Sequence, residues 1–90
     1  MIPRHRLATH PGEILREEYI KPLGLKQTAL ARDLGIPLNR LNEILREKRG
    51  ITADTAWRLA RRFKSSPEFW MNLQSTYELS RVRLSEDAAA

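Results

Sequence analysis

Apolar residues recur every three or four positions in five short segments, and this helical period constrains the fold more than any other feature of the sequence. Glycine and proline interrupt the pattern at Pro11-Gly12, Gly24, Gly35-Ile36-Pro37 and Gly50, and Ser65-Ser66-Pro67 precedes the last segment. The segments do not show the period of two that is typical of a half-buried strand. The sequence therefore predicts an all-α fold of five short helices.

The length of 90 residues supports one small hydrophobic core and leaves no room for a second. We expect a single domain over residues 1–90, with an ordered core at residues 9–84 and flexible tails at residues 1–8 and 85–90. The absence of cysteine excludes disulfides and zinc-finger ligand sets and favours a reduced, cytoplasmic location. Two histidines are too few for a histidine-rich metal site, so we expect no metal or other cofactor. The apolar runs are too short to cross a membrane.

The net charge of +5 is concentrated in the middle of the chain. Residues 26–64 carry ten basic and four acidic side chains, whereas residues 1–25 are nearly neutral and residues 65–90 are slightly acidic. A positive surface of this kind attracts the phosphate backbone of nucleic acids. Charge alone fits a solvated, arginine-rich helical surface equally well.

Residues 27–45 have the pattern of a helix-turn-helix. Ala31 is small, as expected where the second helix crosses close to the first. Gly35 permits the turn, and Ile36 fills the angle between the helices. Three apolar side chains then anchor the second helix to the core: Leu41, Ile44 and Leu45. The alternative is a helical hairpin in some other all-α domain, where Gly35 only ends a helix.

With its anchors buried, the second helix exposes a polar face that suits the major groove of DNA. The side chains expected at base edges are Leu38, Asn39, Arg40 and Asn42. The two asparagines are neighbours on one helix surface and can each bond adenine through N6 and N7. Arg40 reaches either guanine or a phosphate, and Leu38 either meets a thymine methyl group or closes the core. The expected phosphate contacts are Lys26, Gln27, Arg46, Lys48 and Arg49.

Three stretches resemble signatures of the HigA antitoxins, which are also described as VapI-like or plasmid-maintenance antidote proteins within the XRE helix-turn-helix group. They are residues 9–25, which include Thr9-His10-Pro11-Gly12-Glu13, residues 48–56 and residues 66–74. The resemblance covers about residues 9–84. It implies a five-helix, lambda-repressor-like domain that dimerises and represses its own operon by binding operator DNA with an inverted repeat. It also implies direct binding and neutralisation of a HigB-type toxin, an mRNA-cleaving ribonuclease.

The chain departs from this family at the start of its expected recognition helix. The family usually has polar residues where this sequence has Pro37 and Leu38, and a serine often stands at the position of Lys26. Pro37 suits a helix start but removes an N–H group that would be available to bond a phosphate. The operator sequence therefore does not carry over from the family.

The family resemblance also implies two protein interfaces. The last helix pairs across a two-fold axis in the family, which makes Trp70, Tyr77 and Leu84 the expected dimer contacts. Phe69 and Leu73 are expected in the core. The toxin docks on the first helix in one mode of this family, where three carboxylates suit a basic ribonuclease: Glu13, Glu17 and Glu18. The alternative for these carboxylates is a solvated helix face.

An enzyme is the other class of function to consider. Glu17 and Glu18 are adjacent and point in different directions, so they do not form a catalytic dyad. The sequence contains no glycine-rich phosphate loop, and we expect neither catalysis nor a small-molecule substrate. A further alternative is a stand-alone XRE-type repressor with no toxin partner, which the helix-turn-helix alone does not distinguish from an antitoxin.

Overall fold

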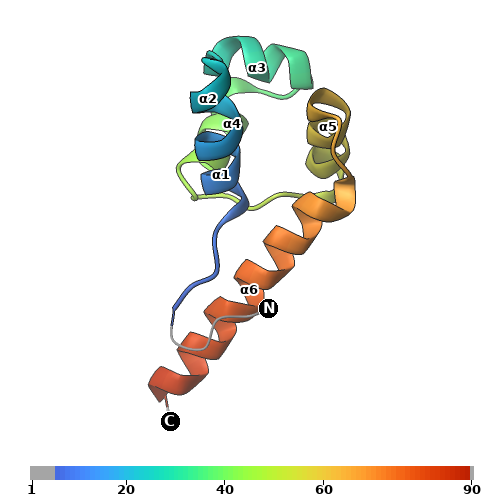
Figure 1. Cartoon of the computed structure of the whole chain (residues 1–90). Helices are drawn as coiled ribbons and strands as arrows, with labels where there is room; N and C mark the ends of the chain where they lie inside the picture. The colour runs from blue at the N-terminus through green and yellow to red at the C-terminus, as the bar shows by residue number, and fades with distance from the viewer. Residues whose placement is uncertain (1–5, 90) are drawn as a thin grey trace.

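A computed structural model describes residues 6–89, which form helices and the loops that join them (Figure 1). The elements are α1 (Pro11–Ile14), η1 (Leu15–Ile20), α2 (Lys21–Leu23), α3 (Gln27–Leu34), α4 (Leu38–Leu45), α5 (Ala53–Phe63) and α6 (Pro67–Ala89). The first three elements are one continuous helical run, so the described chain has the expected five helices. The all-α prediction is therefore confirmed.

The first helical run begins at a histidine cap and widens before a proline. His10 Nδ1 accepts the Gly12 N–H at 2.8 Å, and Pro11 occupies the first helical position. Pro22 lacks an N–H group and cannot make the usual bond to the carbonyl four residues earlier. The preceding turn widens instead into η1, a π-helix, in which the Lys21 N–H donates to the Arg16 carbonyl. Gly24, at φ 62°, ends the run.

The helix-turn-helix forms where the sequence predicts it. Gly35 ends α3 in the left-handed conformation at φ 72°, and Ile36 is buried in the angle between α3 and α4. Pro37 precedes α4 as an extended N-terminal cap residue. Ala31 is buried, as are the three anchors of α4, which are Leu41, Ile44 and Leu45.

The first helical run and α4 touch backbone to backbone. Gly12 lies so close to the Ile44 carbonyl that a Cβ atom at this position would overlap it. The Arg16 guanidinium donates from Nη1 to the Leu45 carbonyl near the end of α4. These contacts fix the position of α4 relative to the N-terminal helix.

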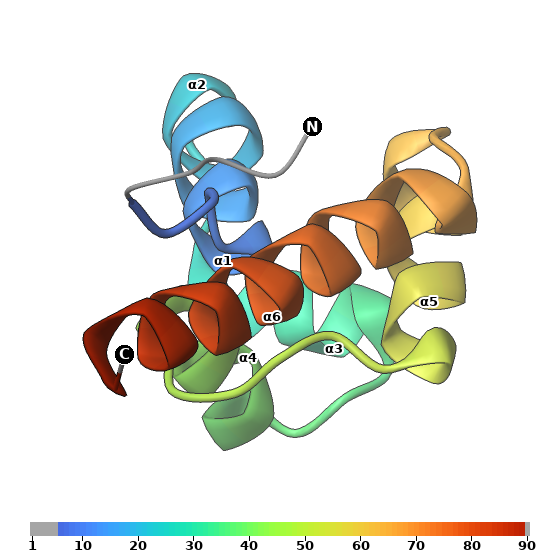
Figure 2. The ribbon, with the colours of Figure 1, turned by 90° about the horizontal axis from the view of Figure 1, so that it is seen from below.

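Trp70 of α6 is fully buried at the centre of the core. Its ring centroid lies 5.5 Å from that of Tyr19, and its indole N–H donates to Ser65 Oγ at 3.0 Å. Figure 2 shows α6 crossing the bundle, with the first helical run on one side and α5 near the N-terminal end of α6. The core therefore joins α6 to the helix-turn-helix.

The last helix is longer than the sequence predicts. Ser66 caps it by accepting the Phe69 N–H at 3.0 Å, and it continues to Ala89 beyond the bundle (Figure 1). The expected flexible tail from residue 85 is thus helical as far as Ala89, because the local sequence favours helix even where its side chains are exposed. Ala8, expected in the N-terminal tail, donates its N–H to Ser80 Oγ at 3.0 Å. Residues 1–5 lie outside the described part.

The loop between α4 and α5 is held against α6 by a buried glutamine. Gln74 Oε1 accepts the Ile51 N–H at 2.6 Å, and Gln74 Nε2 donates to Glu78 Oε1 at 3.0 Å. Gly50 packs so tightly on this amide that a Cβ would lie 2.6 Å from Gln74 Nε2. The basic loop at residues 46–49 is therefore attached to the core at its C-terminal end. Within residues 6–89, no helix is long and apolar enough to span a membrane.

Candidate nucleic-acid interface

The exposed faces of α3 and α4 meet at an open hollow of about 900 Å³. It is lined by Ile20, Leu25, Lys26, Gln27, Thr28, Leu38, Asn39 and Asn42. Five of the expected DNA contacts, two for phosphates and three for bases, therefore line one surface. Sequence reasoning missed Thr28 and the two aliphatic residues that precede α3. The position of Thr28 next to Gln27, at the start of α3, is the signal that could have identified it.

A hydrogen bond between side chains links the two helices of the motif. Asn42 Nδ2 donates to Gln27 Oε1 at 3.3 Å, so the first turn of α3 is tied to the exposed face of α4. The bond leaves Asn42 Oδ1 available as an acceptor and Gln27 Nε2 available as a donor. A phosphate oxygen accepts such a donor, and the amino group of adenine or cytosine donates to such an acceptor.

Leu38 does not close the core. Its side chain is 44% exposed at the first turn of α4, next to the exposed Asn39. Of the two alternatives for this residue, burial is therefore excluded.

Arg40 lies away from the hollow. Its Nη1 is 3.7 Å from Asp54 Oδ2 at the start of α5, and its side chain is 33% exposed. Asp54 also receives Arg58 Nε at 2.9 Å, so two arginines share this carboxylate. This pair places the Arg40 guanidinium beside the start of α5, and the choice between a guanine and a phosphate contact stays a prediction.

Arg58 is a structural residue that the sequence did not single out. Its Nη1 donates to the Leu34 carbonyl at 2.9 Å and the Gly35 carbonyl at 3.3 Å, which caps the C-terminus of α3. Through these bonds α5 holds the turn of the motif in place.

The basic loop after α4 lies in solvent at the other end of the recognition helix. Arg46, Lys48 and Arg49 are exposed, and Arg49 Nη2 lies 3.2 Å from Glu43 Oε1. Glu47 takes a left-handed conformation at φ 62°, which turns the chain sharply at this point. The expected phosphate contacts thus flank both ends of the exposed face, with Lys26 and Gln27 at one end.

The carboxylates of the first helical run differ in their surroundings. Glu17 lies 3.0 Å from Arg16 Nε and 2.8 Å from Lys21 Nζ. Hydrogen bonds from Lys21 and Arg16 lower the pKa of the Glu17 carboxyl. Glu13 and Glu18 are exposed on the same run. The three expected toxin contacts therefore share one helix, but one of them is already paired.

The structure corrects two expectations for α6. Trp70, expected at a dimer interface, has no exposed surface and belongs to the core. Phe69, expected in the core, is 40% exposed. Tyr77 is half-buried, with its ring edge against His10 at 4.7 Å between centroids, and Leu84 is also half-buried. Leu79 and Val82 are 54% and 55% exposed, so the apolar surface of α6 lies mainly on residues that sequence reasoning did not select.

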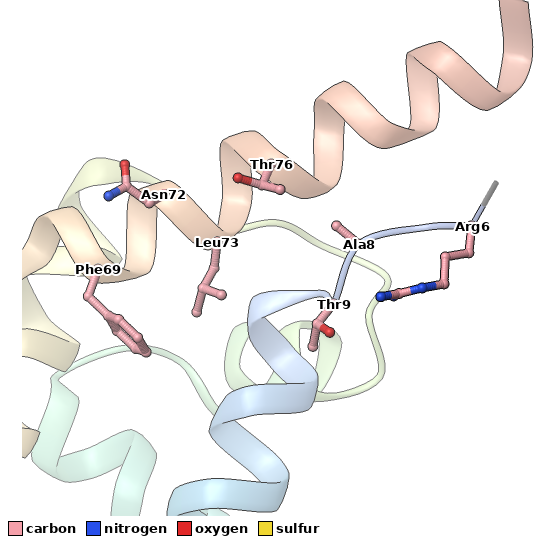
Figure 3. A pocket seen from close by; sticks show the side chains of 7 residues that line it. All are labelled: Arg6, Ala8, Thr9, Phe69, Asn72, Leu73 and Thr76. Carbon is pink, nitrogen blue, oxygen red and sulfur yellow. The ribbon is translucent and has the colours of Figure 1, made fainter. Parts of the chain in front are cut away.

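A second hollow, of about 360 Å³, is lined by residues of α6 and of the N-terminal segment that precedes α1. Figure 3 shows Phe69 and Leu73 projecting from α6 toward this segment, with Arg6 and Thr9 on the opposite side. The hollow lies on a different surface from the one that contains the expected DNA contacts.

The geometry defines a class of protein: a solvent-facing polar helix held by a tight turn against a second helix is the helix-turn-helix of DNA-binding proteins. A family described as helix-turn-helix matches residues 17–70. Virulence-associated protein I of Dichelobacter nodosus is 58% identical over 72 residues, which cover 80% of this chain and 67% of that protein.

Two solved structures match almost the whole fold. The Pseudomonas aeruginosa antitoxin HigA with the higBA promoter is 45% identical, with a TM-score of 0.87 over 91% of this chain and 89% of that chain. The antitoxin GraA in complex with its operator is 40% identical, with a TM-score of 0.87 over 99% of this chain and 90% of that chain. The chain therefore belongs to the XRE-type helix-turn-helix family that includes the HigA antitoxins, which confirms the resemblance. The members of this family are DNA-binding regulators and not enzymes.

Proposed function

We propose that the chain is the antitoxin of a HigBA-type toxin–antitoxin system. In this proposal it binds operator DNA as a sequence-specific autorepressor and neutralises a ribonuclease toxin by direct contact. The observation that carries the DNA-binding part is the bonded pair Gln27–Asn42 beside Asn39, on an exposed face with basic residues at both ends. Two related structures, the antitoxin HigA with the higBA promoter and the antitoxin GraA with its operator, support the same function.

In the proposed complex α4 enters the major groove, and Asn39 and Asn42 contact base edges. Gln27 and Lys26 bind phosphates on one side, and the loop at residues 46–49 binds them on the other. Phosphate contacts set affinity and position, whereas base contacts set specificity. Arg40 takes a phosphate role in this arrangement because Asp54 holds it outside the hollow.

Replacing Asn39 and Asn42 together with alanine tests this division of roles. We expect binding to the operator to weaken by about 1–3 kcal/mol for each lost contact, while binding to unrelated DNA stays unchanged. Both affinities are measured by fluorescence anisotropy at one salt concentration. The matched control is Asn72→Ala, which removes an exposed asparagine of α6. Equal loss on operator and unrelated DNA would rule out the base-reading role.

The proposed functional unit is a homodimer that pairs through α6. The exposed Leu79 and Val82 are three residues apart on one face of α6 and form the apolar surface that supports this arrangement, whereas the half-buried Tyr77 and Leu84 lie on the opposite face of the helix. Two recognition helices about 34 Å apart then read an inverted repeat. Sedimentation at micromolar concentration tests the dimer, and Leu79→Asp is expected to give a monomer with unchanged helix content. A wild-type monomer in the same experiment would refute it.

The proposed toxin surface is the first helical run, where the exposed Glu13 and Glu18 offer charge to a basic partner. Glu17 supports their arrangement through Arg16 and Lys21. The alternative is a stand-alone repressor, which predicts no such partner. A short basic open reading frame beside this gene is the candidate toxin, and its product should co-purify with the wild-type chain but less with Glu13→Lys/Glu18→Lys. Failure of the wild type to co-purify with it would remove the antitoxin function and leave the repressor function.

A further inference from the structure

The hollow beside the recognition helix contains an apolar surface among its polar groups. Ile20, Leu25 and Leu38 line it together with the side chains expected to contact DNA. Leu38 is 44% exposed at the first turn of α4, where Asn39 is its neighbour. An aliphatic side chain gains nothing from a phosphate or from a hydrogen-bonding base edge, so this surface suits a different chemical group.

The major groove presents one apolar group, the C5-methyl group of thymine. A methyl group at C5 of cytosine occupies the equivalent place in the groove. On the basis of the proposed DNA binding, we infer that Leu38, supported by Ile20 and Leu25, binds the C5-methyl group of a pyrimidine in each operator half-site. The methyl contact is the same for thymine and 5-methylcytosine, so methylation of a cytosine at this position strengthens binding.

The expected size of the effect follows from the burial of one methyl group. Transfer of a single carbon group from water to an apolar surface contributes about 0.8 kcal/mol, which corresponds to about fourfold in affinity. A dimer on a symmetric operator makes the contact twice, so removing both methyl groups weakens binding by about 16-fold.

The experiment begins by selecting the preferred operator from a random inverted-repeat library. Each thymine of a half-site is then replaced by deoxyuridine, which lacks only the methyl group, and affinity is measured by anisotropy. We expect one position to lose about fourfold per half-site. At that position 5-methylcytosine should bind about fourfold better than cytosine, because the two bases share the same hydrogen-bonding groups.

The variants at Leu38 assign the contact. Leu38→Ala should bind thymine and deoxyuridine operators equally, whereas Leu38→Met retains an apolar contact and should keep the preference. Leu7→Ala, which removes a 46% exposed leucine outside the hollow, is the control that should behave as wild type. Circular dichroism verifies that each variant keeps its helix content.

Three results would overturn the inference, and only one of them would also refute the proposed operator binding. If deoxyuridine is neutral at every position while Asn39 and Asn42 still determine specificity, the methyl contact is refuted and the proposed function stands. If the deoxyuridine penalty persists in Leu38→Ala, the methyl group is bound elsewhere. If the selection enriches no sequence, the inference and the proposed operator binding are both refuted.

Discussion

The amide of Gln74 offers a direct test of how the core holds the basic loop. Its Oε1 accepts the buried Ile51 N–H at 2.6 Å, while Gly50 packs against the same amide. Gln74→Met keeps the length of the side chain but removes the acceptor. A buried N–H without a partner costs about 1–3 kcal/mol, so we expect the free energy of unfolding to fall by this amount.

Urea unfolding followed by circular dichroism measures this loss. In a domain of this size, each 1 kcal/mol corresponds to a fall of about 4–8 °C in Tm. The control is Glu78→Ala, which removes the exposed partner of Gln74 Nε2 and should change stability by less than about 0.5 kcal/mol. A Gln74→Met variant as stable as wild type would show that the Ile51 N–H finds another partner, which would refute the reasoning.

Three further outcomes are expected. Neutralising Lys48 and Arg49 with glutamine should reduce the slope of log affinity against log salt by about four, since a dimer loses four phosphate contacts and each contributes about 0.9; an unchanged slope would exclude these contacts. Trp70→Ala should lower the free energy of unfolding by about 3–5 kcal/mol in urea titrations. If the variant instead keeps near-normal stability but no longer dimerises, Trp70 is a dimer contact and not a core residue. Burial lowers the pKa of His10 below its ordinary value of 6.5, so the unfolded chain binds the proton more readily. Stability should therefore be fully present above about pH 6.5 and decline as the pH falls below it, and His10→Asn, which can still cap the helix, should lack this dependence in urea titrations at several pH values.

The helix-turn-helix was predictable because its determinants are local. Gly35 sets the turn through its own backbone freedom, and the spacing of Ile36 and Leu41 decides which face of α4 is buried. The same reasoning placed the two asparagines on the exposed side. These inferences need only the helical period and the neighbouring residues.

The errors arose where the answer depends on distant contacts. An apolar residue of α6 has the same spacing whether it faces the core or another copy, so periodicity did not distinguish Trp70 from Phe69. The sequence left two roles open for Arg40, and the direction of its side chain depends on Asp54, which belongs to a different helix. The apolar pattern does not reveal the π-helical turn. Its signal is Pro22, which lacks the N–H group that an α-helix would use at this position.

The close approach of Gly12 to Ile44 has a mechanical consequence for the proposed binding of two partners. Because no side chain separates the two backbones, the first helical run and the recognition helix cannot slide past each other without a steric clash. The surface with Glu13 and Glu18 and the surface with Asn39 and Asn42 therefore move as one rigid body. In the proposed function, a toxin on the first surface therefore changes DNA binding by tilting or covering the whole unit, rather than by reshaping the proposed recognition helix.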